Sequence, residues 1–82
     1  MIKEWVVYIV SCSDRSLYTG ISKNVEKRIK EHNTSNRGAK YTKSRRPVKL
    51  VYLSHPMNKS NALKEEHKIK KLSRKQKLKL LK

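Results

Sequence analysis

The sequence is poor in the residues that build several kinds of site. Among its 82 residues it has one cysteine, two glycines, two prolines and no phenylalanine. A lone cysteine excludes an internal disulfide and a zinc site made of cysteine pairs, and it is typical of a reducing compartment. Two glycines leave no glycine-rich loop to cradle a phosphate. The longest apolar run, WVVYIV, is too short to cross a bilayer, and we expect no signal sequence before it. We therefore expect one small soluble domain over residues 1–82, with no membrane partner.

Acidic residues are also scarce. Six Asp and Glu oppose 22 Lys and Arg, which gives a formal net charge of +16 and a pI near 10.4. Such an imbalance is typical of nucleic-acid-binding domains, although lysine can also serve only to keep a chain soluble. The six acids are scattered, so they do not predict the carboxylate cluster of a two-metal nuclease. Nucleic acid is the expected partner.

Hydrophobic periodicity predicts an α/β protein of the α+β type, ordered ββαβαα, with a small three-stranded antiparallel sheet flanked by helices. The continuous apolar run Val6–Val10 predicts a central strand. The other elements follow in sequence: a strand over Leu17–Ile21, a helix over Ser22–Asn33, a strand over Val48–Leu53, a helix from Asn58 or Ser60 to Leu72, and a short helix after a capping box of Ser73 and Gln76.

Two tyrosines, Tyr8 and Tyr18, fall on the two strands of the expected hairpin. A four-residue loop over Ser13–Ser16 would place them on opposite faces of the sheet, because side chains alternate along a strand. A loop of three or five residues would make them diagonal neighbours on one face. A shared site therefore requires the odd loop or a bulge.

The first helix carries Arg28 and His32 one turn apart. A helical wheel places His32 beside the apolar stripe and Arg28 at its edge, whereas Glu31 is expected to point elsewhere. Structural roles alone would be an arginine whose stem covers apolar surface and a core histidine.

Glu66 is the other unusual residue, because it falls between Leu63 and Ile69 on the apolar stripe of the second helix. Burying a carboxylate is costly unless it is paired or binds a metal. An inward ion pair of Glu66 with Arg28 or a lysine is the structural alternative.

Taken in order, the segments VVYIV, LYTG, KRIKEHN, AKYT and ALKEEHKIKKL closely resemble the GIY-YIG nuclease family, in particular its small stand-alone bacterial members. The resemblance covers nearly the whole chain. It implies that the catalytic residues are Tyr8, Tyr18, Arg28 and His32, and that Glu66 ligates the metal. Gly20 matches the glycine of the second motif. Beyond Glu66, larger active relatives have an asparagine, where this chain offers only Gln76.

The resemblance implies a Mg²⁺- or Mn²⁺-dependent endonuclease that uses one ion and hydrolyses DNA phosphodiester bonds, with structured or damaged DNA as a candidate substrate. It also implies a monomer in the bacterial cytosol or nucleoid, with a partner protein as an option. Which tyrosine acts as the base stays open. The alternatives are a non-catalytic module that binds DNA or RNA with the same fold, and an RNA- or ribosome-associated protein.

A basic loop precedes the third strand and is expected to follow the phosphate backbone, with Tyr41 stacking on an unpaired base. Its candidate nucleic-acid-binding residues are Arg37, Lys40, Tyr41, Lys43, Arg45 and Arg46.

Overall fold

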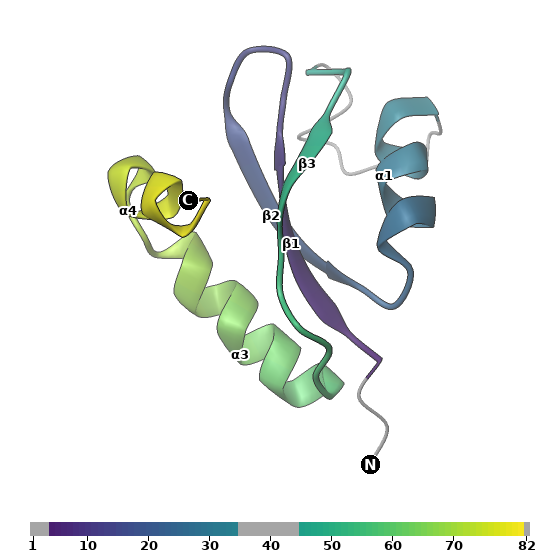
Figure 1. Ribbon diagram of the computed structural model, residues 1–82, viewed down its shortest axis with the longest axis vertical. Coiled ribbons are helices and arrows are strands. Elements are labelled where there is room, and N and C mark those ends of the chain that lie inside the picture. The colour runs from purple at the N-terminus through teal and green to yellow at the C-terminus, as the bar shows by residue number, and fades with distance from the viewer. Residues whose placement is uncertain (1–3, 35–44, 82) are drawn as a thin grey trace.

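The computed structural model describes residues 4–34 and 45–81, and it has the predicted α+β architecture (Figure 1). The elements are β1 (Val6–Ser11), β2 (Leu17–Ser22), α1 (Val25–Thr34), β3 (Lys49–Leu53), α3 (Lys59–Lys70) and α4 (Arg74–Leu80). The order ββαβαα is confirmed. No helix among these residues is long and apolar enough to cross a membrane.

The sheet is antiparallel throughout, with strand order β2-β1-β3. β1 is the central strand, as its continuous apolar run predicted, and Val7 to Val10 are all buried. A strand that is hydrogen-bonded on both edges and covered on both faces has no solvent-facing side, so its residues are apolar on both faces. β1 is therefore paired on both edges and buried along its middle, and it carries Tyr8.

The β1–β2 loop has five residues, Cys12–Ser16, because Ser11 pairs with Leu17. The Cys12 N–H donates to the Ser16 carbonyl at 2.9 Å and closes the loop. Inside it, Asp14 Oδ1 accepts from the Ser16 backbone N–H at 3.0 Å, and Arg15 has a left-handed φ of 68°. Short polar side chains commonly stabilise such turns. The predicted condition for a shared face, an odd loop, is met.

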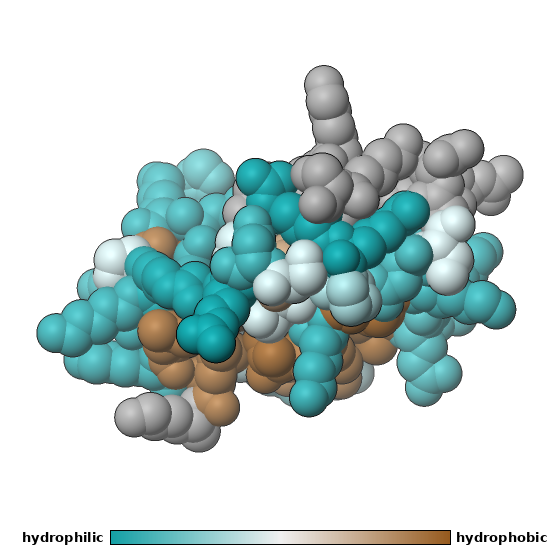
Figure 2. Space-filling model, turned by 90° about the horizontal axis from the view of Figure 1, so that it is seen from above, coloured by the Kyte–Doolittle hydropathy of each residue, from teal (hydrophilic) through white to brown (hydrophobic). Residues whose placement is uncertain are grey.

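Each face of the sheet has its own small core. Val7 and Ile9 pack with Ala62 and Ile69 of α3 on one face. Tyr8 and the next alternate residues of β1 pack on the other face, against α1. Figure 1 shows the sheet between α1 on one side and α3 with α4 on the other. Figure 2 shows hydrophobic side chains gathered in one band, with polar side chains around it. The sheet thus separates a mostly apolar core from one that contains polar residues.

Side-chain caps begin the two C-terminal helices as the sequence predicted. Asn58, not Ser60, caps α3, and its Oδ1 accepts from the Asn61 N–H at 2.8 Å. Ser73 and Gln76 form the capping box of α4. The Gln76 Oε1 accepts from the Ser73 N–H at 2.9 Å, so this side chain is used to start the helix.

Candidate active site

Tyr8 lies opposite Gly20 in the β1–β2 ladder, and the side chain of Tyr8 crosses over that glycine. A Cβ at position 20 would lie 2.6 Å from the Tyr8 hydroxyl oxygen and 2.8 Å from its Cζ. Only a residue without a side chain leaves room for the ring. The glycine of the Tyr-x-Gly pattern therefore has a steric cause, because the ring of Tyr8 packs directly against the backbone of Gly20.

The Tyr8 hydroxyl is held between two residues of α1. It lies 2.9 Å from His32 Nε2, and both side chains are buried. The guanidinium of Arg28 also hydrogen-bonds the same hydroxyl. Arg28 can only donate to the phenol oxygen, and in the His32 tautomer that carries its proton on Nδ1, Nε2 accepts from the Tyr8 hydroxyl. The result is a chain of contacts from Arg28 through Tyr8 to His32.

Burial sets the protonation states in this chain. Desolvation raises the pKa of Tyr8 to about 12, although its hydrogen bond from Arg28 and the charge of Arg28 act in the opposite direction. Desolvation lowers the pKa of His32 to about 4, and the positive charges of Arg28 and Arg46 add to this decrease. At pH 7 Tyr8 is therefore a neutral phenol and His32 a neutral imidazole. His32 Nε2 is thus available as an acceptor for the Tyr8 proton.

Tyr18 lies on the same sheet face as Tyr8, as its diagonal neighbour. Its ring meets the His32 ring edge-on, with 5.5 Å between the centroids. Unlike Tyr8, Tyr18 is only half-buried, so it borders the site at its solvent side. The two phenols and the imidazole form one contiguous group.

Glu31 is part of the site's surroundings, and our expectation that it points elsewhere is wrong. Its Oε1 lies 3.1 Å from a terminal nitrogen of Arg28, and its side chain is 21 % exposed. The i,i+3 spacing makes such pairs possible on any helix. The sequence contained that signal, but a wheel centred on the apolar stripe assigned Glu31 to the solvent.

Glu66 is partly buried on α3, with 19 % of its side chain exposed. Its Oε2 pairs with Lys70 Nζ at 3.4 Å within its own helix, so the partner is a lysine, one of the two structural alternatives, and not Arg28. Its charge nevertheless helps to raise the pKa of Tyr8, which places the carboxylate within electrostatic reach of the phenol. No group of three His, Cys, Asp or Glu side chains suited to a metal occurs in residues 4–34 and 45–81.

The two arginines before β3 have structural partners. Arg46 donates to the His32 and Glu31 carbonyls near the end of α1, and so ties this segment to the helix. Arg45 Nε pairs with Asp14 Oδ2 at 3.0 Å. The capping role of Arg46 was not predicted from the sequence. The other four residues of the predicted basic surface, Arg37, Lys40, Tyr41 and Lys43, lie outside the described residues.

This arrangement of a tyrosine pair, an arginine and a histidine on one face of a three-stranded sheet agrees with a comparison against protein families. Residues 4–79 match the family model described as the GIY-YIG catalytic domain. The chain belongs to the GIY-YIG family, a nuclease family, and this membership implies a nucleic acid substrate.

More particularly, the chain is similar to the bacterial proteins named UPF0213. It is 59% identical over 76 residues to the UPF0213 protein of Syntrophus aciditrophicus, covering 93% of this chain and 87% of the relative. The identity to UPF0213 protein SSP2268 of Staphylococcus saprophyticus is 59% over 75 residues, with 92% and 90% covered. The solution NMR structure of UPF0213 protein BH0048 from Bacillus halodurans is 43% identical, with a TM-score of 0.60 over 94% of this chain and 81% of that one. The predicted resemblance is confirmed.

Proposed function

We propose that this protein is a Mg²⁺-dependent endonuclease that hydrolyses DNA phosphodiester bonds. The observation that supports it most strongly is the buried hydrogen bond between Tyr8 and His32, with the guanidinium of Arg28 at its edge. Buried polar groups cost stability unless they are paired, and a packed core has simpler ways to fill this space. A phenol hydrogen-bonded to a neutral imidazole and to a cation has the composition of a proton-transfer site.

In the proposed reaction, the Tyr8 oxygen takes a proton from the attacking water while its own proton passes to His32 Nε2. This shuttle avoids a free phenolate, which the pKa of about 12 disfavours at neutral pH. A phosphate bound nearby raises the basicity of His32, because an anion stabilises the imidazolium. His32 therefore serves as the proton store, and Tyr8 is the group that contacts the nucleophile.

Arg28 and Tyr18 act on the phosphate. Arg28 lies at the edge of the buried group, 29 % exposed, where its charge offsets the charge that develops on the phosphate oxygens. The half-buried phenol of Tyr18 orients the phosphate or the attacking water. Glu31 holds Arg28 before the substrate arrives.

The donor set fits one Mg²⁺ or Mn²⁺ ion. A single carboxylate, Glu66, suits a hard cation that keeps several waters and takes its other ligands from phosphate oxygens. Glu66 is partly buried and its partner is an exposed lysine, so the carboxylate is accessible for exchange from Lys70 to a metal. When bound, the ion supplies Lewis-acid stabilisation of the leaving oxygen. The proposed enzyme acts as a monomer, because one chain supplies every group named. We place it in the cytosol or nucleoid, where its proposed DNA substrate lies.

The test is incubation with a panel of branched, nicked and single-stranded DNAs in Mg²⁺ or in EDTA. We expect cleavage in Mg²⁺ and none in EDTA. Glu66→Gln keeps the side-chain volume but removes the charge, so cleavage should fall by several orders of magnitude. DNA binding should change little, because the formal charge of +16 merely rises by one.

The same panel separates the rival functions. A parent protein that binds every DNA and cleaves none would favour the non-catalytic module. A folded Glu66→Gln protein that cleaves as fast as the parent would remove Glu66 from the mechanism. Thermal melts of both proteins run in parallel identify any loss that arises from unfolding.

A further inference from the structure

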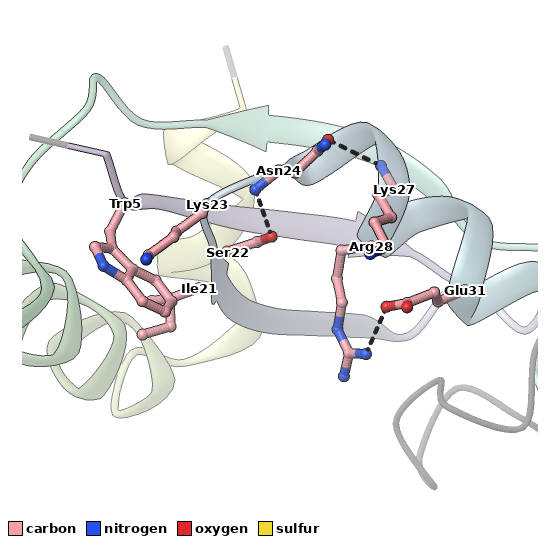
Figure 3. Close-up of a pocket in the computed structure, with 8 residues that line it drawn as sticks. All are labelled: Trp5, Ile21, Ser22, Lys23, Asn24, Lys27, Arg28 and Glu31. Atoms are coloured by element: carbon pink, nitrogen blue, oxygen red, sulfur yellow. Dashed lines mark hydrogen bonds and ion pairs between the residues drawn. The ribbon is translucent and has the colours of Figure 1, made fainter.

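A groove of about 300 Å³ opens beside Arg28, at the outer edge of β2 (Figure 3). Its lining residues are Trp5, Ile21, Ser22, Lys23, Asn24, Lys27, Arg28 and Glu31. Figure 3 shows Trp5 at one end, Arg28 and Glu31 at the other, and the end of β2 between them. The groove shares Arg28 with the candidate active site, because Arg28 also hydrogen-bonds the Tyr8 hydroxyl.

Trp5 is the only tryptophan of the chain, and its backbone is firmly placed. The Trp5 N–H donates to the Met57 carbonyl at 2.9 Å, and the Met57 N–H donates back at 2.8 Å. Two ammonium groups, Lys23 Nζ and Lys59 Nζ, lie 5.5 and 5.2 Å from the ring centroid. The face of an indole ring binds cations and can also stack on a planar group such as a nucleotide base, once the cation moves aside. Since Lys23 is 59 % exposed, it can leave the ring at little cost.

The charge around the groove favours an anion. Lys23, Lys27 and Arg28 line it, and Lys59 borders it at Trp5. Glu31 opposes Arg28 at 3.1 Å, and Glu4 lies outside the lining, 3.7 Å from Lys23. Cations thus outnumber acids in the lining. A polar, cationic trough that ends on an aromatic ring has the composition of a site for one nucleotide, with phosphates on the cations and the base on the ring.

We propose that this groove is a subsite for an unpaired DNA nucleotide adjacent to the bond that is cleaved, with its base stacked on Trp5 and its phosphate on Lys23 and Lys27. The proposal rests on the proposed function, because it assigns Arg28 to the scissile phosphate. A paired base inside a duplex has both faces covered by its neighbours, so away from the duplex ends only an unpaired base can stack on Trp5. The subsite therefore selects substrates with a single-stranded nucleotide at the cleaved position.

The single tryptophan makes the proposal directly measurable. The protein in EDTA is titrated with a short thymidine oligonucleotide while tryptophan fluorescence is recorded. We expect saturable quenching. An oligonucleotide of equal length and charge made of abasic units, and a long blunt-ended DNA duplex without unpaired bases, should bind with much weaker quenching. Equal quenching by all three DNAs would overturn the proposal. So would a titration in which a uridine RNA oligonucleotide quenches the fluorescence and the thymidine DNA oligonucleotide does not.

Variants then measure the contribution of the ring. Trp5→Leu should weaken binding of a labelled thymidine oligonucleotide about tenfold or more, because it removes the stacking surface, and Trp5→Phe should restore most of the affinity, because it keeps an aromatic face. Affinity for the long blunt-ended duplex should be the same in all three proteins. Lys23→Gln should weaken binding more than Lys75→Gln, an equal charge change at an exposed position on α4. Equal decreases in affinity for the thymidine oligonucleotide and the blunt-ended duplex in Trp5→Leu would contradict base stacking.

Binding in EDTA does not depend on catalysis, so the two proposals fail separately. A protein that never cleaves but shows base-dependent quenching keeps the subsite and loses the endonuclease. A protein that cleaves in Mg²⁺ without base-dependent quenching loses the subsite alone. Should Trp5→Leu not fold, the quenching titrations of the parent still decide.

Discussion

Replacing Gly20 by alanine tests whether the position of the Tyr8 hydroxyl, and not merely its presence, matters for function. The added Cβ would lie 2.6 Å from that oxygen, so the oxygen must retreat by about 0.8 Å to reach an ordinary contact of 3.4 Å. Tyr8 has little freedom to do so, because it is 1 % exposed and stands on the central strand. Its hydrogen bond to His32, now 2.9 Å long, would lengthen or break.

Two magnitudes follow from this displacement. Overpacking of a buried position costs about 1–3 kcal/mol, which in a domain of this size corresponds to a decrease in Tm of roughly 5–20 °C. Displacement of a catalytic group by about 1 Å costs about 100-fold in rate. Gly20→Ala should therefore lose far more cleavage activity than its stability loss explains at a temperature where it is folded.

The assay pairs thermal melts with single-turnover cleavage of the best DNA from the panel, well below the Tm. Thr19→Val is the matched control, because Thr19 is the neighbouring buried residue of β2 and lies on the opposite face. Its Oγ1 is the buried side-chain atom left without a hydrogen-bond partner in the described part of the chain, so losing the hydroxyl should not destabilise the protein. Parent-level cleavage by Gly20→Ala would refute the reasoning.

Four other predictions concern Tyr8, His32 and the two arginines before β3. Tyr8→Phe should lower cleavage by about 100-fold or more and leave the fold intact, since the ring still fills its place; cleavage at the parent rate would exclude Tyr8 as the proton shuttle. The pKa of His32 is about 4 in the folded protein against 6.5 in the unfolded chain. Between these pH values the unfolded chain binds a proton that the folded protein does not bind. The free energy of unfolding should therefore decrease as the pH falls from 6.5 to 4. Melts at pH 7 and pH 5 check this, and His32→Gln should reduce the difference between them. DNA affinity should fall linearly on a log–log plot against salt, and Arg45→Gln should flatten the slope by about one unit for each phosphate that it no longer neutralises; a flat salt dependence in the parent would contradict phosphate tracking. Arg46→Gln should in addition lower the Tm, because Arg46 also holds the end of α1.

The elements could be predicted from sequence because their signals are local. A few neighbouring residues were enough to predict each of three elements. These residues are the apolar run of β1, the Asn58 cap of α3 and the Ser73–Gln76 capping box of α4. The register of the hairpin is a different case. It depends on whether Cys12 belongs to the loop, and the hydrogen bond from Cys12 to Ser16 decides this against the shorter turn. The sequence therefore showed that Tyr8 and Tyr18 share a face only if the loop has an odd number of residues, but it could not determine the length of the loop.

Partners of charged side chains were harder to predict. Arg28 pairs with Glu31 one turn away, and Arg46 reaches back to the carbonyls of α1 from a segment far along the chain. A wheel treats helix residues by their angle alone, whereas a long side chain can bend around the edge of the apolar stripe. Which charge a long side chain meets is a property of tertiary packing.

The location of Tyr8 and His32 in the core has a consequence for how such a protein can change over evolutionary time. In a domain this small, the residues proposed for chemistry are among the largest fully buried side chains. A lineage that lost the reaction but kept the scaffold would be free to exchange this polar pair for apolar residues, and well-packed apolar replacements of buried polar groups are often neutral or stabilising. A Tyr8→Phe, His32→Leu double variant that melts at or above the parent temperature would show that folding does not require the pair. The presence of Tyr8 and His32 in the core would then reflect selection for activity and not for stability.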